Sequence, residues 1–139
     1  MLSEGMLKHE FIVQTIEWGL NKLRQVQLAQ LLLMRSVITE RHFDWQELYD
    51  SISGRSESII GSNGHYRIVI PVEKRLRFAD MKRFSTGGKG PNAKVYNRPT
   101  WGVLFGRDDS VKTRLREGIS DSLRENLLSQ LRQAVSDNS

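Results

Sequence analysis

Apolar residues at both ends of the chain recur at the spacing of long amphipathic helices. The N-terminal repeat predicts a helix over residues 8–38 and consists of Ile12, Ile16, Leu20 and Leu23. In the C-terminal part, apolar residues recur at every fourth position: Val111, Leu115, Ile119, Leu123, Leu127 and Leu131. A helix of about 30 residues is roughly 45 Å long. Each helix therefore needs a partner for its apolar stripe, either in this chain or in another copy.

The N-terminal helix has one weak position and more apolar residues than one stripe requires. Gly19 costs about 1 kcal/mol relative to alanine inside a helix. Four large apolar residues lie off the main stripe: Trp18, Val26, Leu33 and Met34. We therefore expect this helix to present apolar side chains to more than one neighbour.

A second, shorter helix is predicted over residues 44–53. Asp44 is a favourable N-cap, and Glu47 stands where a capping box places the reciprocal acid. Ser53 and Gly54 end the helix. Its buried face would consist of Trp45, Leu48, Tyr49 and Ile52.

The next segment, residues 55–81, is predicted to form strands. Residues 61–64 contain an Asn-Gly pair between two β-favouring runs, which indicates a β-hairpin. In the second strand, Tyr66, Ile68 and Ile70 would share one face, and Pro71 would end the ladder. Residues 73–81 fit neither helical nor strand periodicity cleanly, and we favour a strand or a short turn there.

Residues 82–98 are predicted to be a basic loop, followed by a helical C-terminal part over residues 99–135. The segment 85–93 contains three glycines and a proline without periodicity, so we expect it to be mobile. Pro99 suits the first position of a helix, and residues 108–110 suit the cap of the last one. The fold class is therefore α+β: long helix, short helix, small antiparallel sheet with a mobile basic loop, and long C-terminal helix.

The composition indicates one globular domain over residues 1–139. Hydrophobic residues make up 38% of the chain, charged residues 27%, and cysteine is absent. The absence of cysteine excludes disulfides and thiolate chemistry and favours the cytoplasm. The most apolar window, residues 26–38, is too short and too polar to cross a bilayer. We therefore expect a cytoplasmic protein with no membrane partner.

Positive charge is concentrated in one window, residues 73–98. Eight of the 21 Lys and Arg residues lie there with only two acids, giving +6 in a chain whose net charge is +5. We take ten residues as candidates for contact with a partner or with phosphate: Lys74, Arg75, Arg77, Lys82, Arg83, Lys89, Lys94, Tyr96, Arg98 and Trp101.

Two interpretations of this window stay open. Lys and Arg side chains could bind a nucleic-acid backbone while Tyr96 or Trp101 stacks on bases. Alternatively, the window could be an assembly surface that meets an acidic protein.

Other motifs point to no chemistry. Gly87-Gly88-Lys89-Gly90 lacks the hydroxyl and the helix that a phosphate-binding loop requires. The three histidines are too far apart in sequence to suggest a metal site. Asp80, which lies among basic residues, is expected to be a salt-bridge partner rather than a general base. We therefore expect no enzymatic activity, no catalytic residue, no metal and no cofactor.

Three segments resemble a known group of proteins. Leu76-Arg77-Phe78-Ala79-Asp80-Met81-Lys82, Tyr96-Asn97-Arg98-Pro99-Thr100-Trp101-Gly102 and the later residues 115–124 are similar to small uncharacterised proteins. These proteins are encoded in prophage-like regions of Bacteroides and related bacteria. The resemblance covers roughly residues 60–130.

The order of elements resembles, more distantly, the phage tail-completion or minor tail proteins, which join heads to tails. Residues 47–52 are similar to the segment that precedes the first strand in that family. The resemblance implies a structural role in a ring-shaped tail or neck assembly, in the cytoplasm and then in the virion. Its partners would be other copies and phage structural proteins. The alternative from the residues is a small basic nucleic-acid-binding protein that uses residues 73–101.

Overall fold

The structure is a computed structural model that describes residues 4–62, 64–84 and 87–137. Its long axis is formed by α1 (Glu4–Leu33) and α6 (Val111–Asp137). Between them in sequence lie α2 (Arg35–Glu40), α3 (Trp45–Ser53), β1 (Ser58–Ser62), β2 (His65–Val69), α4 (Lys74–Ala79) and α5 (Asn97–Phe105). The predicted α+β class is confirmed.

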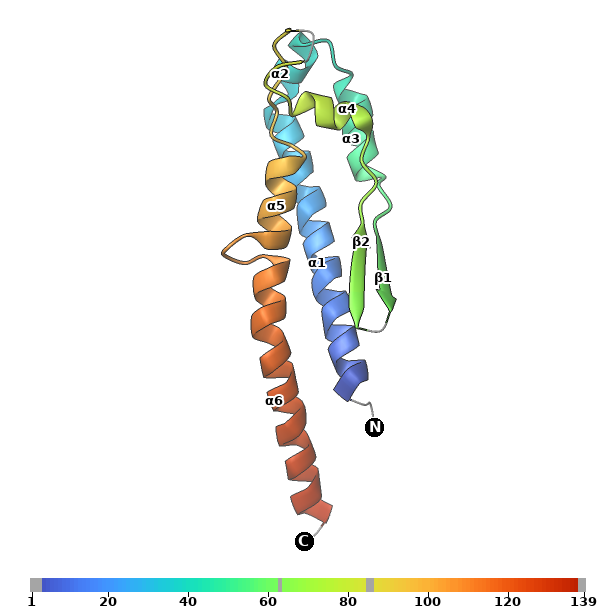
Figure 1. Ribbon diagram of the computed structural model, residues 1–139, viewed down its shortest axis with the longest axis vertical. Coiled ribbons are helices and arrows are strands. Elements are labelled where there is room, and N and C mark those ends of the chain that lie inside the picture. The colour runs from blue at the N-terminus through green and yellow to red at the C-terminus, as the bar shows by residue number, and fades with distance from the viewer. Residues whose placement is uncertain (1–3, 63, 85–86, 138–139) are drawn as a thin grey trace.

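The elements are arranged on two sides of α1. Figure 1 shows the β-hairpin on one side of α1 and α5 with α6 on the other. At one end of the molecule lie α2, α3, α4 and the segment between α4 and α5. Both termini lie at the opposite end, where α6 continues past the start of α1.

The hairpin forms as the Asn-Gly pair predicts. β1 and β2 are antiparallel, with Ile59 opposite Ile68. Tyr66, Ile68 and Ile70 are partly buried against apolar residues of α1, which confirms that they share one face. Asn63, in the turn itself, lies outside the described residues.

Buried apolar residues form two clusters that α1 connects. The central cluster consists of Ile12, Ile16, Leu20, Leu104 and Val111. The end cluster consists of Leu31, Ile38, Trp45, Leu48, Ile52, Leu76, Ala79, Ala93 and Val95. The predicted buried face of the helix at 45–53 is thereby confirmed for Trp45, Leu48 and Ile52, while Tyr49 is partly buried.

Two glycines bring α1 and α6 into close contact. A Cβ atom at Gly19 would lie 2.1 Å from Cγ2 of Val111, and one at Gly118 would lie 2.2 Å from Cζ of Phe11. The helix runs through Gly19 without interruption, so this position serves packing. Leu115 is also packed on the central cluster, as predicted, whereas the side chains of three predicted core residues lie outside the described residues: Ile119, Leu123 and Leu127.

Three predicted segments differ from the structure. Residues 74–79 form α4 rather than a strand, because Leu76 and Ala79, three positions apart, both enter the end cluster. The Glu73 carboxylate caps this helix by accepting from the Arg75 N–H. The helix predicted over 8–38 breaks at Met34, so that Ile38 of α2 turns into the same cluster. The basic loop is shorter than predicted because α5 begins at Asn97.

Candidate interaction surfaces

The eight basic residues of the candidate set are all exposed. They are carried by α4, by the segment between α4 and α5, and by the first turn of α5. Figure 1 shows these segments at the end of the molecule opposite to the termini. Arg75 forms an ion pair with Glu47 of α3, with both side chains largely in solvent. Within the described residues it is the one member of the set in a salt bridge, so the window keeps most of its positive charge.

The described part of the predicted mobile loop is a backbone-bonded turn. The Phe84 N–H donates to the Gly88 carbonyl at 2.8 Å, and the Gly90 N–H donates to the Lys82 carbonyl at 2.9 Å. Arg83 and Lys89 form an antiparallel bridge. Like charges directly opposite each other repel, so an anionic partner would reduce the repulsion between the Arg83 and Lys89 side chains. Ser85 and Thr86 lie outside the described residues, and mobility of the loop stays a prediction.

Asp80 organises the second half of the window. Its carboxylate accepts from the backbone N–H groups of Val95, Tyr96 and Asn97 at 2.7, 2.7 and 2.9 Å. The predicted salt bridge is therefore wrong, because the carboxylate binds the start of α5 instead. An anion at this position also complements the helix dipole. The structural role expected for Asp80 is thus met through backbone donors.

Two glutamines of α1 hold the segment that leads into α5. Gln27 donates to the Val95 carbonyl at 3.1 Å, and Gln30 donates to the Ala93 carbonyl at 2.9 Å. Ala93 and Val95 are buried, which leaves Lys94 between them exposed with a φ of 55°. Sequence reasoning missed both glutamines because they stand in the most apolar part of the helix.

The two aromatic candidates have different environments. Tyr96 is partly buried against the end cluster, which leaves less of its ring available for stacking on a ligand. Trp101 is 64% exposed, and its ring lies 5.2 Å from that of Phe105, which is 54% exposed. Sequence reasoning did not single out Phe105. Its position four residues after Trp101 in a helix was the available signal.

A buried charge cluster connects α1 to the segment between α3 and β1. The Glu57 carboxylate accepts from Arg24 and, at 3.0 Å, from Nε of Arg55. Burial raises the pKa of Glu57, but hydrogen bonds from Arg55, from its own backbone N–H and from Arg24 outweigh that effect and hold the pKa below 4.5. Three unpredicted residues thus lock the hairpin to α1.

An apolar groove lies between the hairpin and the α5–α6 side of the molecule. Its volume is about 380 Å³, and residues of α1, β2, α5 and α6 line it, among them Ile12, Ile68, Leu104 and Leu115. Lys112 is its single charged lining residue within the described chain. A second hollow of about 390 Å³ continues it through Ile12 and Tyr66 toward Lys8.

No constellation for metal binding is present among the described residues. None of the helices in that part of the chain is long and apolar enough to cross a membrane. A scan against family models, a search of curated proteins and a search of solved structures found no match.

Proposed function

We propose that this chain is a structural protein of phage tail or neck assembly that works through protein–protein contacts. The observation that carries the proposal is the projecting end of α6. Leu128, Leu131 and Val135 lie there at the spacing of one helix face and are 47%, 62% and 70% exposed. Unpartnered apolar side chains at such spacing are typical of helices that bind another protein.

The two ends of the molecule also differ in character. One end has the apolar face of α6, and the other has the exposed basic window. A subunit that joins its own copies to a neighbouring component needs two different surfaces, and heterologous contacts between copies form a ring when their rotation closes. The basic end suits an acidic protein surface, and the proposal assigns no catalytic role to any residue.

The proposal is tested by the composition of particles. In an inducible prophage that carries this gene, mass spectrometry of purified virions should find the chain in several copies per particle. Its absence from complete particles, with full expression in the induced cells, would contradict the proposal.

A nucleic-acid-binding function is the second candidate, and the exposure of all eight basic residues and of Trp101 favours it. Binding to duplex DNA would weaken steeply with salt, with a log–log slope of about −0.9 per phosphate contacted. The double variant Arg83→Glu/Lys89→Glu should reduce that slope if these residues contact phosphate. The assembly proposal expects weak binding that is lost at physiological salt.

A further inference from the structure

We propose that the projecting end of α6 from one copy docks into the apolar groove of a second copy. The inference deepens the proposed function and rests on it, because it names the contact that joins the copies. The groove is lined by residues of α1, β2, α5 and α6, and α1 runs between the hairpin and the α5–α6 side (Figure 1). The docking segment is the last part of α6, residues 125–137.

Among the residues that the structure describes, the apolar face of the docking segment is left exposed: Leu128, Leu131 and Val135 are 47%, 62% and 70% exposed. The contacts of Gly19 with Val111 and of Phe11 with Gly118 show that α6 runs toward the start of α1. Because the two helices are antiparallel and each advances by the same length per residue, residues of α6 after about 125 lie beyond Glu4. About 12 residues, roughly 18 Å of helix, therefore project from the body. Figure 1 shows this end of α6 leading away from α5 and from the hairpin, whose residues line the groove. It therefore cannot fold back into the groove that its own chain forms.

The groove and the segment match in chemistry and length. The groove is lined by Ile12, Ile16, Ile68, Leu104 and Leu115, which offer a surface for the Leu128, Leu131 and Val135 face. From Gly5 to Ile16 the floor of the two connected hollows spans 11 positions of α1, roughly 16 Å. A projecting helix of about 18 Å fits that length.

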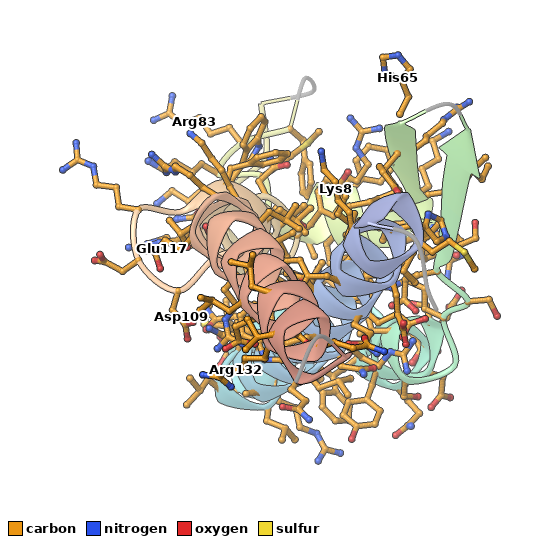
Figure 2. The ribbon with its side chains drawn as sticks, turned by 90° about the horizontal axis from the view of Figure 1, so that it is seen from below. Lys8, His65, Arg83, Asp109, Glu117 and Arg132 are labelled. Carbon is orange, nitrogen blue, oxygen red and sulfur yellow. The ribbon has the colours of Figure 1, made fainter. Side chains whose placement is uncertain are left out.

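The charges around the groove favour an acidic neighbour. Lys112 lines the groove and Lys8 lines its continuation. Figure 2, seen from the end of the molecule that holds the termini, shows Lys8 pointing from α1 toward the space between α6 and β2, whereas Glu117 points away from α1. On the docking segment, two exposed charges stand beside the apolar face, Glu125 three positions before Leu128 and Arg132 one position after Leu131. Glu125 can thus meet a lysine at the groove.

Because groove and docking segment are different surfaces, each copy can donate one contact and accept another. Such a heterologous contact closes into a ring or continues as a filament. A contact made by one short helix lies in the class of weak interfaces, so association is expected only in concentrated protein.

Cross-linking between cysteine variants tests the docking, because the native chain contains no cysteine. Lys112→Cys at the groove should link to Leu131→Cys when the two single variants are mixed with a short thiol-to-thiol cross-linker. Within one chain these positions are roughly 28 Å apart along α6, so a link must join two copies. A chain with both substitutions should give a ladder of linked species.

Two matched variants serve as controls. Gln133→Cys lies on the opposite side of the docking segment from Leu131, and it should link to Lys112→Cys only at background level. Ser36→Cys lines a hollow beside the exposed Leu32 and Leu33, and it should give no link with Leu131→Cys. In sedimentation experiments, Leu131→Asp should raise the dissociation constant of self-association by at least about tenfold. Gln133→Asp should leave that constant unchanged.

Three results would overturn the docking. The first is a chain that stays monomeric in sedimentation experiments at about 1 mM, where even a weak interface should form. The second is preferential cross-linking of Leu131→Cys to Leu131→Cys. The third is a stronger cross-link of Leu131→Cys to Ser36→Cys than to Lys112→Cys. These outcomes are separable from failure of the proposed function. Links without the chain in virions would contradict the function alone, whereas a virion component without links would contradict the docking alone.

Discussion

Single residues hold the basic window in place although they carry no positive charge. Asp80 satisfies three backbone donors at the start of α5, and Gln27 and Gln30 bind the segment before it. Asn92 and Lys94 in that segment have φ values of 49° and 55°, which cost of order 1–3 kcal/mol each. These bonds therefore fix a backbone that would otherwise relax.

Replacing Asp80 by alanine should lower the free energy of unfolding by about 2–3 kcal/mol, because hydrogen bonds to a charged acceptor are lost. Urea unfolding followed by circular dichroism measures the change. Asp108→Ala, at an exposed acid, should change it by less than about 0.5 kcal/mol. An Asp80→Ala protein as stable as the Asp108→Ala protein would show that α5 does not depend on this carboxylate.

The Glu57 cluster should make stability depend on acid pH. Because the pKa of Glu57 is lower in the folded protein than its ordinary 4.5, its contribution is present above pH 4.5 and is lost as pH falls through the folded value. Glu57→Gln should cost about 3 kcal/mol at pH 7, since Arg55 stays buried without its anion, and the difference from wild type should shrink at pH 3.

Urea unfolding at both pH values measures this difference, with Glu40→Gln at an exposed acid as the control. A Glu57→Gln penalty that is equal at pH 7 and pH 3 would exclude the charge as its cause.

Among the elements, the close approach of α1 and α6 depends on glycine. Gly19→Ala should destabilise the protein by about 1–3 kcal/mol despite the better helix propensity of alanine, because its Cβ would overlap Val111. Gly102→Ala in α5, where a Cβ meets nothing within 4 Å, should instead stabilise by up to about 1 kcal/mol. Thermal unfolding distinguishes the two. If both variants were stabilised, the helices would be further apart than the structure shows.

The basic loop should differ in protease access along its length. Trypsin is expected to cut at Arg83 or Lys89 before Lys94, because Lys94 stands between the buried Ala93 and Val95. Mass spectrometry of early fragments identifies the first site. First cleavage at Lys94 would mean that the segment opens from the end cluster more readily than the loop does.

Local signals in the sequence predicted most helices and strands, whereas the contacts that hold these elements together involve residues far apart in the sequence. The Asp44 cap, the Asn-Gly hairpin and the Ser110 cap of α6 depend on residues a few positions apart, and all were predictable. The six residues of α4 were too few to show a period. Asp80 binds residues 15–17 positions away and Gln27 reaches 68 positions, so no local pattern indicates either contact.

The basic window could be predicted from the sequence, but the apolar groove and the environment of Tyr96 could not. Exposed lysines and arginines follow from composition, so all eight basic residues lie at the surface as expected. The burial of Tyr96 and the apolar groove arise from how the elements pack together. A periodic pattern shows that a helix has an apolar face, but it does not show which part of that face is left without a partner.

At the scale of the whole molecule, the chain is an elongated body in which the end of α6 projects past the start of α1 (Figure 1). The projecting helix has one exposed apolar face, and the opposite end carries the exposed basic window. The central claim is that the chain joins structural components through these surfaces. Replacing Leu131 by aspartate removes the apolar contact without touching either core cluster, since this side chain is 62% exposed. The matched variant, Gln133→Asp, puts the same charge on the opposite side of the helix.

Electron microscopy of particles from an induced prophage that carries each variant is the most direct measurement. The Leu131→Asp variant is expected to give DNA-filled heads with unattached or aberrant tails, and the Gln133→Asp variant is expected to give complete particles. Complete, infectious particles from Leu131→Asp, with the variant protein present at the wild-type level, would contradict the claim.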